Sequence, residues 1–391
     1  MKNYASFLLV VATVYCDNVN LLEKFASANN RFSADVYKEI KKTESGNFLF
    51  CPLSAEIILA LTRVGSRGNT ARQLSKGLHL SDDTNEIEQI FKELTSKLKS
   101  DEGYTLNSAN KIYLNQKYEI RESFKTTAQN SFSADITSVD FNMKTTAANE
   151  INKWVSEQTH NNIKDVVDAE MFTAATVGVL VNALYFKSTW VTEFHERATQ
   201  RKPFYFNINN HVDVDMMEVT DYYKYFKSDK LKAKFLEMPY VGDRYSMVFV
   251  LPYEKDGLEQ LEYQLEDVFD ISPRYKVKVH VQVPKFKTEF KVELTDILKN
   301  LGIKDAFEDD ADLIGFTTSG PGAMKISSVV QKAVIEVDEK GTTAAAATSV
   351  HFINSLPAVP APIEEFNADH PFIYYIKGSS GVMFIGRYVQ K

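Results

Sequence analysis

A long segment near the C-terminus, residues 339–371, shows neither the spacing of an amphipathic helix nor the alternation of a strand. Four of the chain's eleven prolines fall between residues 357 and 371, where they restrict the backbone and remove hydrogen-bond donors. Structureless segments of this length are uncommon inside compact domains, and they are usually functional or disordered. The rest of the chain must therefore form a domain that can carry this segment, and we expect the function to lie within it.

The chain has no internal boundary at which it divides into domains. Before residue 340, no Gly/Ser/Pro-rich stretch, charge run or repeat separates two apolar blocks. We therefore expect one large domain, although 391 residues would by length alone suggest more. A hydrophobic content of 44% with 25% charged residues is ordinary for a globular protein. The net charge of −7 is spread along the sequence and does not indicate a nucleic-acid partner.

The periodicity of the apolar residues alternates between helical and strand-like. Helical spacing predicts helices within residues 22–40, 57–61, 87–98, 145–164 and 292–301. Apolar runs or strict alternation predict strands at 177–186, 246–251 and 276–283, and a hairpin of 372–376 with 382–389 around the turn 378–381. This mixture indicates an α+β fold.

The N-terminus has the pattern of a secretory signal peptide. Lys2 provides a positive start, an apolar run extends from Phe7 to Val14, and Cys16 suits the position before a cleavage site. The run is too short to span a bilayer, which takes about 20 residues. A buried strand is the alternative interpretation. We expect removal of residues 1–16, which would leave 17–391 as a single secreted, extracellular domain.

The sequence lacks the motifs of the common enzyme classes. His195-Glu196 begins a zinc-protease motif, but position 199 is Thr where a second His is required. The spacing in Gly378–Gly381 does not suit a nucleophile elbow, and no phosphate-binding loop or Cys-x-x-Cys pair is present. Cys51 lies in an apolar stretch, which favours a buried small residue over a reactive thiol. We therefore expect no enzyme activity, no metal and no cofactor.

The start of the long segment has an unusual composition. From residue 339 it reads Glu-Lys-Gly-Thr-Thr-Ala-Ala-Ala-Ala-Thr, and every side chain from Gly341 to Ser349 is small and uncharged. An alanine-rich run can form a short surface helix. The same run also suits a strand buried on both faces, because none of its side chains requires water. A segment compatible with both an exposed and a buried state is what a loop-inserting switch needs.

This run and several other segments together resemble the serpins. The hinge has the family's Glu-Lys-Gly-Thr motif followed by alanines. The other matching segments are the central-strand signature Val181–Lys187 with Trp190, the helix start Phe50–Ser54, the strand Val283–Phe286, and the C-terminal signatures Ala368–Phe372 and Phe384–Arg387. The resemblance covers essentially residues 20–391, and the sequence most resembles those of secreted serpins from insects and other invertebrates.

The resemblance implies the serpin fold, with three mainly antiparallel β-sheets, about nine helices and an exposed reactive-centre loop at about residues 339–362. It also implies a monomeric protease inhibitor that acts as a suicide substrate. A target protease cleaves the loop and forms an acyl-enzyme. The freed loop then enters the central sheet and traps the protease in a covalent complex; serpin loop insertion is itself a standard example of strand addition. The native state is then metastable and held by a kinetic barrier.

The resemblance also assigns roles to individual residues, and it implies that Lys285 and Glu339 form a partly buried ion pair at the top of the main sheet, where the hinge strand leaves it. The hinge comprises Glu339, Gly341, Thr342, Ala344, Ala345, Ala346 and Ala347, and the region that parts to admit the loop includes Lys285, Trp190, Ser54, Asn182 and Gln331. Two positions depart from the family: Cys51 stands where Ser is frequent, and Gln331 stands where many serpins have His. Because Gln can still donate and accept hydrogen bonds, we expect altered stability and retained function.

The loop composition restricts the target protease. Inhibitory serpins usually place the residue before the scissile bond sixteen positions after the hinge glutamate, which gives Ser355, followed by Leu356. The segment from Ser355 to Phe366 is longer than usual, so any bond up to Ala358–Val359 is an alternative cleavage site. No Lys or Arg occurs from residue 350 to 362, so a trypsin-like protease finds no cation for its acidic pocket. An elastase- or chymotrypsin-like serine protease is therefore the expected target.

Two alternatives remain open. Ser355 suits the small pocket of an elastase-like protease. Phe352 and Ile353 instead offer a chymotrypsin-like protease an aromatic residue, or a papain-like cysteine protease an apolar residue beside its cleavage position. A non-inhibitory serpin with a binding, storage or chaperone role is the second alternative, although such members typically carry bulky, charged or proline residues in the hinge. Activation by a glycosaminoglycan is not supported, because Glu and Lys alternate within 87–98 and form no basic cluster.

Overall fold

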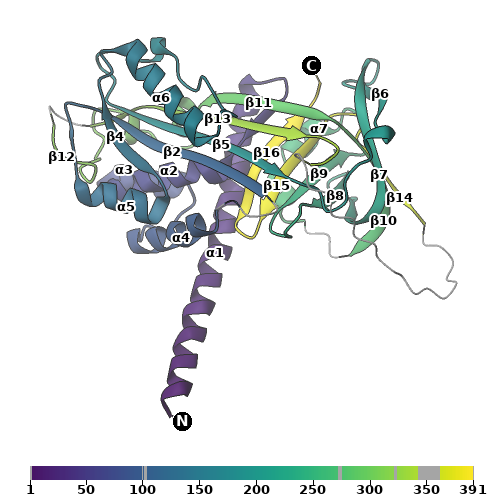
Figure 1. Cartoon of the computed structure of the whole chain (residues 1–391), viewed down its shortest axis with the longest axis horizontal. Coiled ribbons are helices and arrows are strands. Elements are labelled where there is room, and N and C mark those ends of the chain that lie inside the picture. Colours follow the sequence, from purple (N-terminus) through teal and green to yellow (C-terminus); the bar gives the residue numbers. More distant parts are fainter. Residues whose placement is uncertain are drawn as a thin grey trace.

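The computed structural model describes residues 2–98, 100, 104–271, 275–320, 324–341 and 362–390, with side chains from residue 21 onward. Within these residues it contains nine α-helices and three β-sheets of nine, five and two strands (Figure 1). This mixture agrees with the α+β fold predicted from the sequence.

The helices and strands have the following bounds. The helices are α1 (Lys2–Thr43), α2 (Pro52–Gly65), α3 (Gly68–Gly77), α4 (Thr84–Lys97), α5 (Glu122–Phe132), α6 (Lys144–Gln158), α7 (Leu258–Glu262), α8 (Leu265–Phe269) and α9 (Thr295–Asn300). The five-stranded sheet has the order β11 (Phe286–Glu293), β13 (Ile326–Val337), β5 (Gly178–Ser188), β2 (Tyr104–Asn115) and β4 (Asp135–Val139).

The nine-stranded sheet has the order β1 (Phe48–Phe50), β16 (Gly381–Tyr388), β15 (Phe372–Gly378), β9 (Ser246–Pro252), β8 (Ala233–Pro239), β7 (His211–Ser228), β10 (Lys276–Pro284) and β14 (Glu364–Asn367), with β6 (Gln200–Tyr205) paired to β7. The small sheet pairs β3 (Glu119–Ile120) with β12 (Thr317–Ser319).

The five-stranded sheet is covered on both faces, with α6 lying across one of them (Figure 1). The side chains of β5 alternate between two hydrophobic clusters: Val179, Val181, Ala183 and Tyr185 pack with α6, and Leu180, Leu184 and Phe186 lie in the main core. A strand buried on both faces has no position for an exposed polar residue. This explains the nearly unbroken apolar run from which the strand was predicted.

The hairpin β15–β16 is a buried part of the nine-stranded sheet, next to β1 at one end of the strand order, and it confirms the hairpin predicted for residues 372–389. Its strand β16 is tied to two helices by charge. The Arg387 guanidinium donates to the Glu262 carboxylate of α7 at 2.9 Å, and the Tyr37 hydroxyl of α1 donates to the same oxygen at 2.8 Å. Charge-assisted hydrogen bonds of this kind are stronger than neutral ones, and they fix the angle at which α1 meets the sheet.

The helices expected from periodicity are confirmed except at two boundaries. The helix expected within 145–164 ends at Gln158, and residues 159–164 are not helical. The helix predicted for residues 292–301 begins too early, because Val292 and Glu293 are the last residues of β11 and pair with β13. The helix α9 starts only at Thr295. At the N-terminus, α1 continues the predicted helix 22–40 in both directions. The expected cleavage after residue 16 stays a prediction.

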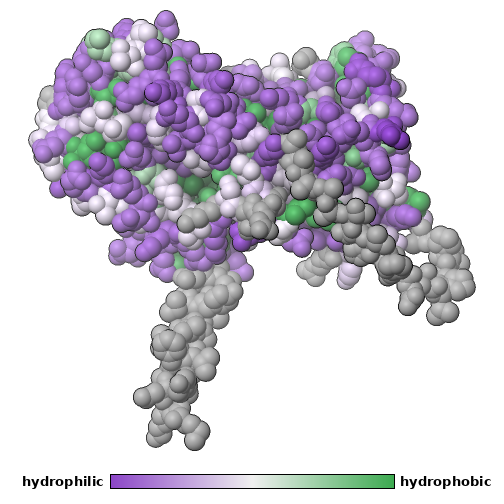
Figure 2. Space-filling model, in the orientation of Figure 1, coloured by the Kyte–Doolittle hydropathy of each residue, from purple (hydrophilic) through white to green (hydrophobic). Residues whose placement is uncertain are grey.

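The surface of the described residues is mostly hydrophilic on the face shown in Figure 2, and its apolar residues form small separate groups. Scattered exposed apolar residues of this kind are normal for folded proteins. Across the described part of the chain, none of the helices is both long and apolar enough to cross a membrane.

One carboxyl group lies in the core between helices. Glu56 of α2 is fully buried, and the Asn29 side-chain amide of α1 donates to its Oε2 at 2.6 Å. Its Oε1 has no hydrogen-bond partner among the described residues. Burial raises the pKa of Glu56 to about 8, which exceeds the opposing effect of the Asn29 hydrogen bond. Glu56 is therefore protonated and neutral at neutral pH.

Replacing Glu56 should flatten the pH dependence of stability. At pH values between an ordinary carboxyl pKa of about 4.3 and the raised pKa of Glu56, the Glu56 carboxyl keeps its proton in the folded state and has lost it in the unfolded state. Stability should therefore fall as the pH rises through this window, by up to about 1.4 kcal/mol per pH unit. Glu56→Gln keeps the shape and cannot ionise, so it should raise the unfolding midpoint at pH 8 and leave it nearly unchanged at pH 5.

The measurement is thermal unfolding at a fixed scan rate between pH 5 and pH 8. Glu157→Gln, which alters an exposed glutamate on α6, is the matched control and should keep the wild-type profile. Identical pH profiles for wild type and Glu56→Gln would contradict the assignment of Glu56 as a buried neutral acid.

Candidate functional site

The centre of the five-stranded sheet is a parallel pairing between β13 and β5, which we call the seam. The seam's ladder ends where Val334 lies opposite Tyr185. Beyond this pair, the described residues of each strand form ladder pairs only with the strand on its other side. β13 pairs with β11 as far as Val337, and β5 pairs with β2 as far as Ser188. The seam is thus closed along most of its length and forked at one end. Strand edges with unpaired backbone groups can accept another strand.

A buried group of polar side chains, the polar cluster, crosses the seam on the α2 side; it comprises Cys51, Ser54, Asn110, Asn182 and Gln331. The Gln331 amide donates to Asn182 Oδ1 at 2.6 Å, and these two residues are also partners in the ladder. The Asn182 amide donates to the backbone oxygen of Ser54 at 3.0 Å and to Asn110 Oδ1. All of these residues are at most 5% exposed. Because buried polar groups are costly to leave unpaired, the cluster holds the seam in register.

The two departures from the serpin pattern lie within this cluster and contact each other. Gln331 Nε2 donates to the Cys51 carbonyl at 2.9 Å, and Gln331 Oε1 accepts from the Cys51 backbone N–H at 2.8 Å. The Cys51 thiol donates to the Met383 carbonyl at 2.9 Å, and burial raises its pKa. The prediction that Cys51 is a buried residue is confirmed, and its low reactivity stays a prediction. Gln331 therefore fastens β13 both to β5 and to the start of α2.

An ion pair lies at the forked end of the seam, and we call it the entry ion pair. Lys285 precedes β11 and Glu339 follows β13, and their side chains meet at 2.7 Å, as predicted from the sequence. The Thr199 hydroxyl donates to the other oxygen of Glu339 at 2.8 Å. Burial alone would raise the pKa of Glu339, but the hydrogen bonds from Lys285 and Thr199 hold it below its ordinary value. The same bond raises the pKa of Lys285.

The turn that follows β13 is fixed against the end of β5 by Trp190. The indole N–H of Trp190 donates to the Asp338 carbonyl at 3.0 Å, and its ring stacks on Tyr240 with centroids 4.4 Å apart. Gly341 has a φ of +98°, and a Cβ there would lie 2.6 Å from the Ser188 carbonyl oxygen. Only glycine fits this conformation and this close approach. The start of the hinge is therefore held directly above the last residue of β5.

The far end of the loop is also anchored. The described chain resumes at Pro362 and enters β14, which pairs in parallel with β10. The Lys227 ammonium lies 2.7 Å from a carboxylate oxygen of Glu364. The hinge residues Thr342, Ala344, Ala345, Ala346 and Ala347 and the expected bond Ser355–Leu356 lie outside the described residues. Their roles stay predictions.

The sequence analysis missed two residues of this region. Asn110 lies opposite Asn182 in the β2–β5 ladder, and the strand β2 that carries it was itself not predicted. Thr199 follows a short 3₁₀ helix and has no local signal for its contact with Glu339. Among the described residues, no group of three His, Cys, Asp or Glu side chains is arranged to hold a metal ion.

Comparison with known proteins identifies similar proteins along nearly the whole chain. Antichymotrypsin-2 of Bombyx mori is 34% identical over 372 residues, covering 94% of this chain and 98% of the relative. A leukocyte elastase inhibitor of Bos taurus is 37% identical over 385 residues, covering 94% and 99%.

Two solved structures extend the similarity to three dimensions. Serpin48, a highly specific serpin of the insect Tenebrio molitor, matches with a TM-score of 0.87 and 39% identity over 94% of this chain and 98% of that one. Uncleaved ovalbumin matches with a TM-score of 0.82 and 28% identity over 94% of this chain and 100% of that one. The predicted serpin fold is thereby confirmed.

A protein-family model described as Serpin (serine protease inhibitor) matches residues 27–391. The match contains the seam, the polar cluster and the entry ion pair, together with both anchored ends of the loop. The chain belongs to the serpin family.

Proposed function

We propose that this serpin is a secreted inhibitor that traps a target protease by inserting its cleaved reactive-centre loop between β13 and β5. The observation that carries the proposal is the forked seam. The chain leaves β13 through Glu339 and Gly341 at the forked end, and it continues directly into the small, uncharged residues of the hinge. Those residues can occupy a position buried on both faces, as the neighbouring strands do.

Insertion has a clear thermodynamic driving force. The new strand pairs on both sides, so it replaces one ladder by two and gains on the order of a dozen hydrogen bonds at about 1 kcal/mol net each. Burial of the small apolar side chains adds to this gain. The uncleaved protein is then less stable than its inserted form, and a kinetic barrier maintains it. The polar cluster and the entry ion pair supply contacts that must break before the seam opens.

The hinge composition supports inhibition over a binding, storage or chaperone role. Residues 341–349 contain no charged, bulky or proline residue that would oppose burial in the sheet. The relatives include proteins named as antichymotrypsin, antitrypsin and leukocyte elastase inhibitor. Since no Lys or Arg lies between residues 350 and 362, an elastase- or chymotrypsin-like protease is the target class we propose.

The function and the target class are tested together with a panel of proteases. Elastase and chymotrypsin should each give a complex that survives denaturing electrophoresis, and trypsin should not. With elastase, the C-terminal fragment that denaturation releases should begin at Leu356 when analysed by mass spectrometry. Cleavage by every protease without any stable complex would refute inhibition. Stoichiometric trapping of trypsin at a bond within 350–358 would refute the proposed specificity.

Disruption of the entry ion pair should release the hinge. Glu339→Lys places a second cation beside Lys285 and removes the acceptor for Thr199, so the forked end should open and the protein should polymerise faster on warming. The pair is partly exposed at Lys285, so its contribution is smaller than that of a fully buried pair. Because the pKa of Glu339 is lowered, its contribution is complete above an ordinary carboxyl pKa of about 4.3 and is lost as the pH falls through the lowered value.

Size-exclusion chromatography after heating measures the polymerisation. Asp309→Lys is the matched control. The Asp309 carboxylate lies 2.6 Å from the Lys325 ammonium, but its side chain is 93% exposed, so reversing its charge should leave polymerisation as in wild type. A Glu339→Lys protein that stays monomeric as long as wild type would contradict the proposed role.

A charge in the hinge should convert the inhibitor into a substrate. In the inserted strand the side chain of residue 342 enters the sheet interior, where Thr is tolerated and an unpaired charge is not. With Thr342→Arg, deacylation should outpace insertion, and the number of inhibitor molecules consumed per protease trapped should rise at least about tenfold, the factor that corresponds to 1.4 kcal/mol. Thr342→Ser is the matched control. An unchanged stoichiometry for Thr342→Arg would rule out insertion at this hinge.

The proposal of secretion rests on the N-terminal pattern of Lys2, Phe7–Val14 and Cys16. N-terminal sequencing of protein collected from the medium of expressing cells should give Asp17 as the first residue. Retention of the full chain inside the cells would contradict it.

A further inference from the structure

The first turn of α2 is bonded to both strands of the seam. The backbone of Cys51, just before the helix, exchanges two hydrogen bonds with the Gln331 side chain of β13. Further along the turn, the Ser54 carbonyl accepts a hydrogen bond from the Asn182 amide of β5. When β13 and β5 move apart, this turn cannot stay bonded to both of them. Opening of the seam therefore requires the start of α2 to move.

Glu56, just beyond Ser54, ties this end of α2 to two further elements. Asn29 Nδ2 of α1 donates to Glu56 Oε2 at 2.6 Å, and Asn29 Oδ1 accepts from the Val382 backbone N–H of β16 at 2.6 Å. Because the Val382 N–H needs an acceptor, the Asn29 amide can turn only its N–H donors toward Glu56. Both side chains are fully buried, so the contact holds the start of α2 against α1 and β16.

A negative charge on Glu56 has little to stabilise it. Burial raises the pKa of Glu56 to about 8, and the Asn29 hydrogen bond is the one opposing cause. Glu56 Oε1 has no hydrogen-bond partner among the described residues. The Cys51 thiol is the titratable group at the start of α2 that senses this site, since burial raises its pKa and a charge on Glu56 raises it further. The closed arrangement therefore favours the neutral acid over the carboxylate.

The charged side chains of the elements packed against α2 leave this balance unchanged. On α1, α4, β2 and β16 several of them form pairs of their own, namely Asp35–His79, Lys97–Glu93, Lys111–Asp135 and Arg387–Glu262. On α2 itself, the Arg63 guanidinium donates to the Asp82 carbonyl at 2.6 Å. On α3, α5 and β5 they are exposed or half-buried, at Arg72, Lys76, Glu122, Lys125 and Lys187. None of these groups contributes to the pKa shift of Glu56.

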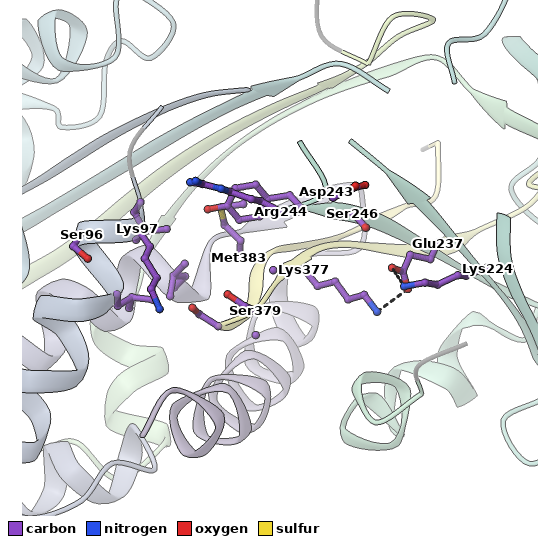
Figure 3. A pocket seen from close by; sticks show the side chains of 17 residues that line it. Ser96, Lys97, Lys224, Glu237, Asp243, Arg244, Ser246, Lys377, Ser379 and Met383 are labelled. Atoms are coloured by element: carbon purple, nitrogen blue, oxygen red, sulfur yellow. Dashed lines mark hydrogen bonds and ion pairs between the residues drawn. The ribbon is translucent and has the colours of Figure 1, made fainter. Parts of the chain in front are cut away.

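Water can reach the Glu56–Asn29 contact from a nearby cavity. The cavity has a volume of about 700 Å³, lies beside the turn between β15 and β16, and is lined in part by Gly381 and Met383 (Figure 3). With charged side chains such as Lys377 in its wall, it is large and polar enough to hold water. Gly381 lies so close to Asn29 that a Cβ on it would collide with Asn29 Oδ1. A small displacement of the start of α2 therefore lets water hydrate a Glu56 carboxylate.

The closed structure favours the neutral acid, and hydration favours the carboxylate. We propose that Glu56 is a positioning residue for the seam: while protonated it locks the start of α2 and the polar cluster, and loss of its proton releases both. The closed seam then has its full stability at low pH. It loses that stability as the pH rises from about 4.3, the pKa of a hydrated carboxyl, to the raised value of Glu56. Opening of the seam matters because of the proposed function, on which this role of Glu56 rests.

Labelling of Cys51 by a thiol reagent measures this release in the uncleaved protein, without any protease. The thiol is fully buried, so it reacts only when the start of α2 moves. Wild type and Glu56→Gln are compared at the same pH, which cancels the pH dependence of the thiol chemistry itself. The ratio of the wild-type rate to the variant rate should rise about tenfold between pH 6 and pH 8, where linkage allows at most about a hundredfold. Peptide mass spectrometry identifies the labelled residue.

Further variants separate the release of α2 from other effects. Val250→Cys places a thiol at a fully buried position of β9 in the other sheet, so it reports global unfolding, and its labelling should be at least about tenfold slower than that of Cys51. Glu157→Gln, which changes an exposed glutamate of α6, should keep the wild-type rates within about twofold at every pH. If Glu56→Gln fails to fold, Glu56→Met, which has a similar length and no proton to lose, takes its place with the same expected ratio.

Two results would overturn the role of Glu56. One is a rate ratio that stays within about twofold from pH 6 to pH 8. The other is equal labelling of Cys51 and of the Val250→Cys thiol, because global unfolding would then explain both. Either result leaves the inhibitory function intact if elastase is still trapped, whereas a missing protease complex refutes inhibition and not the labelling ratio.

Discussion

The parallel pairing of β13 with β5 is the contact on which the rest of the structure depends. Both strands are buried on both faces by apolar side chains. Because apolar contacts are not directional, they alone would not stop one strand from sliding along the other or moving away from it. Register is instead fixed by directional hydrogen bonds between Gln331 and Asn182, which extend to Ser54 and Asn110. In a buried setting such bonds are costly to leave unmade. The seam therefore stays closed until other groups can replace its contacts.

The features around the seam follow from this requirement. The entry ion pair and Trp190 hold the turn after β13 at the forked end, where a new strand would begin to pair. Gly341 lets the backbone turn tightly above Ser188, so the hinge starts at the point of entry. At the far end β14 is paired to β10, so cleavage between the two anchors frees only the hinge side to move. Geometry and hinge composition thus support the same mechanism.

Much of this architecture could be predicted from the sequence, and the failures have physical causes. The unbroken apolar run of β5 and the glycine turn of the β15–β16 hairpin are local signals, and both elements were correct. The helix predicted from Val292 began too early because that residue pairs with Gln331 across a ladder, a partner that local periodicity does not reveal. Thr199 and Asn110 were missed for the same reason. The pairing of Lys285 with Glu339 came from the family resemblance, since the two lie 54 residues apart.

The most direct measurement locks the seam with a reversible bond. Val181 and Val330 are ladder partners, both fully buried, and adjacent strands are about 4.8 Å apart, so a Val181→Cys/Val330→Cys pair is within reach of a disulfide. The account predicts that the oxidised protein is cleaved by a target protease without trapping it, and that reduction restores the covalent complex. Equal trapping by the oxidised and reduced forms would contradict insertion between β13 and β5.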